Sequence, residues 1–234
     1  AQLVAEVDVV MRSERDERFF PAVLETLSSA GLALGDLSQI VVGGGPGSFT
    51  ALRVVGAIAK GIAQARRIPL YALPSLALVA PPLGSPLDSL VGSPSSSPSS
   101  SPTGDAAGAV ERWLVTLDAL RGERYAALVE RERRRGYDDA HDVSSSGAVG
   151  EVIRVEQLGV IPVALLPERA AALRARLLGP DEALQAQPHA RELRHAQRLA
   201  LASGAVDLAS WEPSYGRLAE AQVKWEAAQG RPLR

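Results

Sequence analysis

A glycine-rich turn between an apolar strand and a long apolar helix constrains this chain more than any other feature. Residues 40–42 are Ile-Val-Val, and glycines follow at positions 43, 44, 45 and 47. A long apolar segment, residues 54–67, comes directly afterwards. The pattern predicts a strand, a tight turn and a helix, with Ser48 and Thr50 available to cap the start of the helix.

The glycine-rich turn has two interpretations. Glycines accept positive φ values and let other backbone come close, so the simpler interpretation is steric. Alternatively, the free N–H groups at a helix start attract anions, and Gly45, Gly47, Ser48 and Thr50 would then contact a nucleotide phosphate. Neither G-x-x-x-x-G-K-[ST] nor G-x-G-x-x-G is present, so the motif does not select the second interpretation.

The helix predicted for residues 51–67 has an unusually wide apolar face. Its polar side is narrow and contains Arg53, Ala57, Lys60, Gln64 and Arg67. The remaining arc is about 200° wide, whereas an ordinary surface helix needs an apolar face of little more than 100°. We therefore expect this helix to be covered on two sides, by a second domain or by another chain.

Composition narrows the class of protein. The 234 residues carry a net charge of −2, which does not favour a dedicated nucleic-acid surface. Disulfides and thiolate chemistry are excluded because the chain has no cysteine. No apolar run reaches the ~18 residues of a membrane span, and no signal-peptide pattern opens the sequence, so a cytoplasmic protein is expected.

Hydrophobic periodicity predicts an α/β protein with helices over a mixed sheet. Strands are expected at residues 3–11, 38–42, 68–73, 113–120, 124–129 and 160–166. Helices are expected at residues 16–30, 51–67, 75–79, 167–178, 190–203 and 219–228. Residues 130–135 form a run of charges that is expected to be solvated, and the Ser/Pro-rich residues 81–108 are expected to be a disordered insertion.

No catalytic residue and no metal ligand is predicted. Ser48 lies in Gly-Ser-Phe rather than in G-x-S-x-G, which leaves a hydrolase elbow unsupported. The histidines at positions 141, 189 and 195 lack the H-E-x-x-H and H-x-x-x-H spacings of metal sites. Asp118 and Glu123 flank a short turn, and turn chemistry with solvation is their simplest role.

Residues 45–53, Gly-Pro-Gly-Ser-Phe-Thr-Ala-Leu-Arg, and residues 59–63, Ala-Lys-Gly-Ile-Ala, resemble the signature of the bacterial TsaB (YeaZ) family. Residues 118–125 resemble the family's second-lobe hairpin, and residues 211–217 resemble its Glu-Pro-x-Tyr-x-Arg ending. The family usually has Gly where Ala51 stands and a His near Arg15 and Asp16. The resemblance covers about residues 3–80 and 113–234.

The resemblance implies a two-lobe actin-like ATPase (ASKHA) fold with mixed sheets flanked by helices. Residues 1–80 would form the first lobe, residues 109–204 the second lobe, and residues 205–234 would return to the first lobe. The family's first hairpin, which carries the first phosphate loop of this fold, is missing before residue 3, either because the chain is truncated or because this protein has lost it. Its absence would leave the first sheet without edge strands and puts nucleotide binding in doubt.

The resemblance also implies a function. Members of this family are non-catalytic partners of the TsaD catalytic subunit in forming N6-threonylcarbamoyladenosine at position 37 of tRNA, with the TsaE ATPase also engaged. ATP or ADP would then bind only at the interface of the complex, tRNA would be touched only through the complex, and a homodimer would form when the partner is absent. The alternative is a stand-alone nucleotide-binding enzyme of the actin/sugar-kinase type that uses residues 45–50.

The pairing surface implied by the resemblance lies on the two helices of the first lobe. The wide apolar arc of residues 51–67 agrees with such a contact. The residues expected at the interface are Phe19, Val23, Ala51, Leu52, Arg53, Ala57, Lys60 and Ala63.

Overall fold

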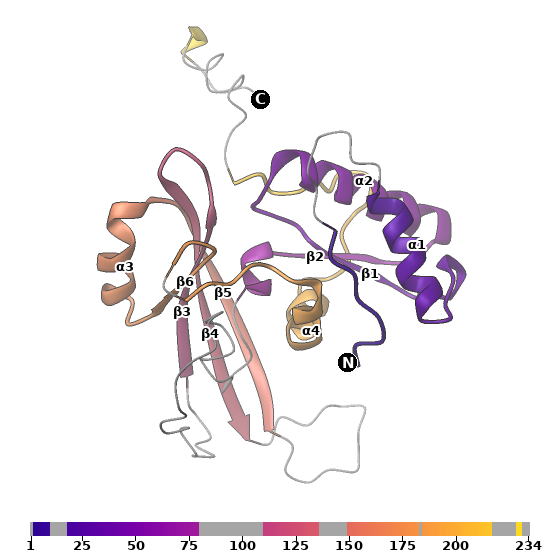
Figure 1. Ribbon diagram of the computed structural model, residues 1–234, viewed down its shortest axis with the longest axis horizontal. Helices are drawn as coiled ribbons and strands as arrows, with labels where there is room; N and C mark the ends of the chain where they lie inside the picture. Colours follow the sequence, from indigo (N-terminus) through magenta and orange to yellow (C-terminus); the bar gives the residue numbers. More distant parts are fainter. Residues whose placement is uncertain are drawn as a thin grey trace.

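The computed structural model describes residues 2–9, 18–79, 110–135, 149–182, 184–216 and 228–230. Within these ranges the chain forms two separate sheets with helices packed against them (Figure 1). The predicted insertion at residues 81–108 and nearly all of the helix predicted for residues 219–228 lie outside the described residues.

The first sheet is small and parallel. It pairs β1 (Ile40–Gly43) with β2 (Leu70–Leu73), and the crossover between them is the long helix α2 (Phe49–Arg66). Side chains alternate along both strands. Val42 and Leu70 therefore pack against α2, whereas Val41 and Leu73 belong to the core on the opposite face, against α4 (Leu193–Ala202).

The second sheet is larger and mixed. Its strand order is β5-β4-β3-β6, with β4 antiparallel to both neighbours and β6 parallel to β3. Both of its faces are covered, since Leu114 packs with α3 (Leu166–Ala172) while Trp113 faces the opposite core. The four strands are β3 (Val110–Asp118), β4 (Glu123–Arg135), β5 (Val149–Pro162) and β6 (Arg176–Leu178).

The short helix η2 (Ser75–Leu78) and α4 join the two sheets into one core. All four residues of η2 are buried, and Leu76 packs with Trp113 of β3. On α4, Ala196 and Ala200 are fully buried in a cluster that includes Leu73 of β2, and Val155 of β5 packs against that cluster. Small side chains on α4 thus let the helix fit between the two sheets.

Most predicted elements of the first half are confirmed with shorter bounds. α1 (Phe19–Ser29) falls within predicted residues 16–30, and Gly31 ends it with φ +71°. The other short helices are η1 (Leu34–Asp36), η4 (Val163–Leu165) and η5 (Ala190–Glu192), and η5 continues into α4. The strand predicted at residues 3–11 is wrong over residues 3–9, because this segment has no strand partner among the described residues.

The second half required three corrections. Residues 130–135 extend β4. The predicted solvated run is wrong at Arg131, which is completely buried on the same face of the strand as Val129, and at Glu130 and Glu132, which are half-buried. Because every residue of this run is charged, the sequence shows no alternation of apolar and polar residues that would indicate a strand. In the sheet, Glu130 pairs with Arg112 at 2.7 Å and Glu132 pairs with Arg154 at 3.1 Å.

The other two corrections concern element type. Of the strand predicted at residues 160–166, only residues 160–162 are strand, as the end of β5, which begins at Val149; residues 163–165 form η4, and α3 begins at Leu166. The predicted helix at residues 167–178 stops at Ala172, because the chain turns at Arg174 with φ +51° and then enters β6.

Asp118 plays the predicted role in a turn: its Oδ1 accepts a hydrogen bond from the Leu120 N–H at 3.0 Å.

No helix among the described residues is both long and apolar enough to cross a membrane.

The outer edge of β1 has no strand partner among the described residues. The N–H groups of Ile40 and Gly44 donate to β2-side carbonyls at 3.0 and 2.7 Å, so the N–H groups of Val41 and Gly43 point the other way. An unpaired strand edge of this kind is a place where further backbone can add.

Hydrogen exchange tests this edge directly. We predict that the amides of Val41 and Gly43 exchange about tenfold or more faster than that of Val42, after correction for intrinsic rates. The reason is that the Val42 N–H faces β2 and is hydrogen-bonded, whereas those of Val41 and Gly43 face the unpaired edge. The measurement is amide exchange followed by NMR on the whole chain. Equal protection at the three positions would show that other backbone covers this edge.

Candidate functional site: the glycine-rich turn and the helix α2

Ser48 connects the turn to α2 as predicted. It is the N-cap residue, and its Oγ accepts a hydrogen bond from the Ala51 N–H at 3.5 Å. Thr50 lies inside the first turn of α2 and is half-buried, so it is not the cap. The helix ends at Arg67, which adopts the left-handed conformation with φ +53°.

Gly45 lies where three segments of backbone meet. Its N–H donates to Ser75 Oγ at 3.0 Å, and its carbonyl accepts from the Ser75 N–H at 2.8 Å. On the other side, a Cβ at Gly45 would overlap the carbonyl oxygen of Ser214, and the neighbouring Gly44 carbonyl accepts from the Ser214 N–H at 2.7 Å. These glycines therefore let the chain's own backbone come close, which is the steric interpretation.

The four residues predicted to contact a nucleotide separate into two groups. Gly45 is buried under the C-terminal segment. Gly47, Ser48 and Thr50 lie at the open start of α2, and a Cβ at Gly47 would meet nothing within 4 Å. Nucleotide contact at these residues stays a prediction.

The C-terminal segment, residues 205–216, covers the second side of α2. A Cβ at Gly56 would lie 3.2 Å from Pro213 Cγ, and Lys60 Nζ donates to the Trp211 carbonyl at 2.9 Å. Val206 extends the contact to β2, since its N–H donates to the Leu70 carbonyl at 2.8 Å. The chain itself thus supplies part of the cover that the wide apolar arc requires.

Asp207 shapes the turn that presents Trp211. The Ser210 hydroxyl donates to its carboxylate at 2.6 Å and the Ala209 N–H donates at 3.2 Å. These two bonds, the first more than the second, lower the pKa of Asp207 below its usual value of 3.8. Because the folded-state pKa is lowered, this carboxylate stabilises the turn above its usual pKa and loses that effect as the pH falls through the lowered value.

An aromatic contact lies beside the start of α2. The rings of Phe49 and Tyr215 are 4.6 Å apart between centroids, and the Arg53 guanidinium carbon lies 5.3 Å from the Phe49 centroid. Phe49 is 49% exposed. The role of Tyr215 was not predicted, although it belongs to the Glu-Pro-x-Tyr segment that the sequence analysis singled out.

The predicted interface residues do not all lie at the surface. Leu52 and Ala63 are buried in the core, and Ala63 packs with Val42 and Leu70, so neither residue is available to a partner. The helical periodicity placed them on the wide apolar arc but did not reveal which side the chain covers itself. The remaining predicted residues are exposed (Arg53, Ala57) or half-buried (Phe19, Val23, Ala51, Lys60).

The structure adds two exposed apolar side chains on α1 that the predicted interface did not include. Phe20 and Leu24 are each 40% exposed, and their spacing of four residues puts them on one face of the helix. Only Ala22 of this helix is buried. The predicted interface already included Phe19 and Val23 of this helix. Periodicity alone did not single out Phe20 and Leu24, because they share one apolar face in sequence with Phe19, Val23 and Leu27.

One group of ligand-type side chains lies away from the turn. Atoms of Glu6, Asp8 and His189 lie within 4.8 Å of one another. The guanidinium of Arg191 lies among them, with its Nε 3.0 Å from Glu6 Oε1. Because this cation already balances one of the carboxylates, we assign no metal to the group.

Comparison with known protein families and sequences gives matches that each cover about a third of the chain. A family model described as "TsaD: tRNA N6-adenosine threonylcarbamoyltransferase" matches residues 10–86. The tRNA threonylcarbamoyladenosine biosynthesis protein TsaB of Bacillus subtilis is 37% identical over 78 residues, which are 33% of this chain and 34% of that protein. TsaB of Escherichia coli is 34% identical over 67 residues, 29% of each chain. The matches thus span about a third of the length of these relatives.

Similarity in structure extends over most of the chain. A solved structure from Pseudomonas aeruginosa, described as an uncharacterized protein with similarity to the peptidase YeaZ, has a TM-score of 0.53 and 22% identity. The similarity covers 90% of this chain and 87% of that one. At this level of identity the comparison shows a shared fold.

The contacts of Gly45 lead to a prediction with a matched control. Replacing Gly45 with Ala should destabilise the chain by at least about 2 kcal/mol, because the new Cβ meets Ser214 and the left-handed backbone disfavours a side chain. Replacing Gly47 with Ala should change stability by about 0.5 kcal/mol or less, since its surroundings are open. Denaturant unfolding measures both, and similar effects of the two substitutions would contradict the described contact.

Proposed function

We propose that this chain, which belongs to the TsaB/YeaZ family, is a non-catalytic scaffold subunit that binds a TsaD-type catalytic subunit. In that role it supports the formation of N6-threonylcarbamoyladenosine at position 37 of tRNA. The names of its relatives link the chain to tRNA threonylcarbamoyladenosine biosynthesis. The scaffold role, the partner and the position of the modified nucleotide are the content of the proposal.

The observation that carries the proposal is the apolar surface left open on α1. Phe20 and Leu24 are 40% exposed on a helix that buries only Ala22. Exposed apolar side chains that gather on one face are typical of a protein interface. The end of α2 is tied to the segment after α1, since Arg66 Nη2 donates to the Gly35 carbonyl at 2.7 Å.

The exposed side of α2 completes the proposed surface. Arg53 and Ala57 are one helical turn apart and both are exposed, whereas the C-terminal segment covers the neighbouring side of α2 at Gly56 and Lys60. A small residue such as Ala57 lets a partner helix come close. The proposed pairing surface consists of Phe19, Phe20, Val23, Leu24, Ala51, Arg53, Ala57 and Lys60.

The remaining parts of the proposal follow the family. The fold is the two-lobe actin-like arrangement, with lobes at residues 1–80 and 109–204 and residues 205–234 returning to the first lobe. A TsaE-type ATPase joins the complex, ATP or ADP binds at the complex interface, and tRNA is contacted through the complex in the cytoplasm. A homodimer through the same surface forms when the partner is absent.

A stand-alone nucleotide-binding enzyme is the second candidate, and the open start of α2 at Gly47 favours it. The occupied surroundings of Gly45 oppose it, because Ser75 and Ser214 already use the polar groups of the turn.

Activity measurements separate the two candidates. The pure chain is expected to show neither ATP hydrolysis nor threonylcarbamoyl transfer, and it should raise transfer when added to a TsaD-type subunit with TsaE and tRNA. The scaffold role would be contradicted if the pure chain hydrolysed ATP steadily and lost this activity when Ser48 is replaced with Ala.

Substitutions to Trp on α2 test the proposed surface. Ala57→Trp should leave the melting temperature unchanged and weaken binding of the TsaD-type subunit about tenfold or more, because a large group enters a packed contact. Ala63→Trp should instead lower the melting temperature, since Ala63 is fully buried.

The matched control is Ala164→Trp, an exposed alanine in η4 on the second sheet's side. It should alter neither stability nor affinity. Calorimetry of binding and thermal unfolding measure both quantities, and unchanged affinity for a well-folded Ala57→Trp variant would place the interface elsewhere.

A further inference from the structure

The turn between β3 and β4, residues 119–122, has residues that its backbone conformation disfavours. Leu120, Arg121 and Gly122 all have positive φ, at +64°, +57° and +74°. Glycine and asparagine adopt this conformation readily, whereas a leucine side chain makes it costly. The turn is nevertheless well formed, since the Glu123 N–H donates to the Leu120 carbonyl at 3.1 Å. The backbone alone would therefore favour Asn or Gly at position 120.

Packing within the chain does not account for Leu120 either. Its side chain is 69% exposed, the largest value for a large apolar side chain among the described residues. Backbone strain that the fold does not use is typical of functional sites, and exposed apolar side chains that gather together are typical of interfaces. Leu120 combines both properties at one position.

The short helix η4 continues the apolar surface beside Leu120. The Val163 N–H donates to the Gly122 carbonyl at 2.9 Å, so η4 lies against the turn. Val163 and Leu165 are 38% and 50% exposed, and Ala164 between them is exposed as well. Figure 1 shows this turn and the start of α3 at the same end of the second sheet. We call Leu120, Val163, Ala164 and Leu165 the end patch.

Carboxylates border the end patch on the β6 side. The Leu120 N–H donates to Asp118 Oδ1 at 3.0 Å, which places this carboxylate directly beside the patch. Arg124 binds Asp118 and Asp181 at 2.8 Å each. Its side chain is 12% exposed, whereas those of the two aspartates are 51% and 67% exposed. Two carboxylates thus share one largely buried guanidinium, and their negative charge faces outward.

These charges indicate what kind of molecule fits the end patch. A partner that places apolar side chains on Leu120 and a cation near Asp181 would complement both features. A second copy of the chain fits less well, because Arg121, the cation of the turn, is already engaged within its own chain. The arrangement therefore favours a different protein with a basic residue beside an apolar pocket.

We propose that the end patch binds a partner protein other than the catalytic subunit, through apolar side chains that lie next to a lysine or arginine of that partner. Leu120 enters an apolar pocket of the partner, and the basic side chain pairs with Asp181. Burial of Leu120 in the complex offsets the backbone cost that the isolated chain bears. This surface lies on the second sheet and is independent of the pairing surface on α1 and α2.

Thermal unfolding of the whole chain tests whether Leu120 serves the fold. Asn adopts a positive φ more readily than Leu, and little apolar contact is lost at an exposed position. Leu120→Asn should therefore keep the melting temperature or raise it by about 1–3 °C.

Photo-crosslinking in the source bacterium tests whether the end patch is occupied. Benzoylphenylalanine replaces Ala164 in the full chain, and a control chain carries it at Gln157, which is exposed on β5 outside the patch. We expect a protein to be crosslinked from position 164 and not from position 157. Its crosslinked peptide, identified by mass spectrometry, should contain apolar residues beside Lys or Arg.

Calorimetry with that protein in pure form tests the chemistry of the contact. Leu120→Asn should weaken binding about tenfold or more, because it removes the apolar anchor. Asp181→Asn should weaken it about two- to fivefold, as for a partly exposed ion pair.

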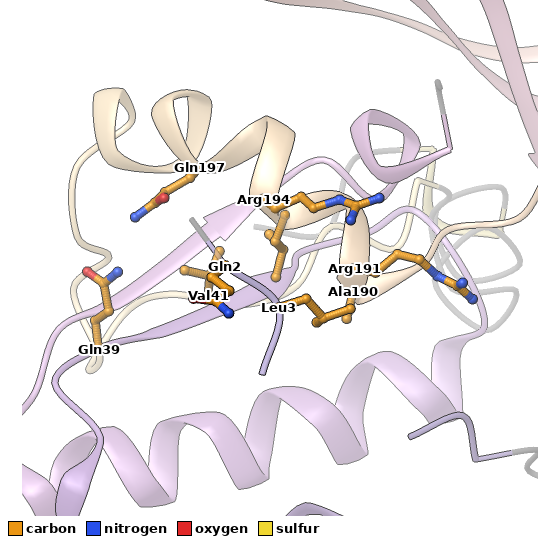
Figure 2. A pocket seen from close by; sticks show the side chains of 9 residues that line it. Gln2, Leu3, Gln39, Val41, Ala190, Arg191, Arg194 and Gln197 are labelled. Atoms are coloured by element: carbon orange, nitrogen blue, oxygen red, sulfur yellow. The ribbon is translucent and has the colours of Figure 1, made fainter. Parts of the chain in front are cut away.

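Two matched controls should leave this affinity unchanged. Leu3→Asn changes another exposed leucine, which Figure 2 shows in the wall of a cavity of about 190 Å³ beside β1 and α4. Glu156→Gln removes an exposed carboxylate of β5 that lies outside the end patch.

The proposal is overturned if no protein is crosslinked from position 164 alone, or if that protein is the catalytic subunit or another copy of the chain. It is equally overturned if Leu120→Asn lowers the melting temperature, or if either Leu120→Asn or Asp181→Asn binds the partner with unchanged affinity.

Discussion

Close backbone contact at Gly45 is the interaction on which the first sheet and its helices depend. Ser75 of η2 bonds both polar groups of this glycine, and Ser214 of the C-terminal segment fills the space that a Cβ would need. The turn, the link between the two sheets and the C-terminal segment therefore meet at a single residue. Any side chain there would separate all three.

From that contact the roles of α2 follow. Its inner side packs on Val42 and Leu70 of the first sheet, and the C-terminal segment covers a second side through Pro213 and Trp211. What remains free is the side with Arg53 and Ala57. The intramolecular cover thus narrows the surface that is available to a partner and leaves α1 to supply the apolar part of it.

Local signals in the sequence predicted the strand-turn-helix unit well, because glycine, the Ser48 cap and helical periodicity all act within a few residues. They failed where the outcome depended on distant contacts. The charged strand ending at Arg135 and the beginning of β5 are set by pairing across the second sheet, which periodicity in one strand does not reveal. For the candidate site, the wide apolar arc correctly required a second cover, but Ala63 and Leu52 could be placed inside only once the covering segment was known.

Hydrogen-exchange footprinting of the complex with a TsaD-type subunit tests the central claim most directly, namely that the chain acts as a scaffold through α1 and α2. The account predicts new protection in peptides from residues 19–29 and 49–58, with no change in the turn at residues 119–122 of the second sheet. Protection confined to the second sheet, with α1 and α2 exchanging as in the free chain, would contradict it.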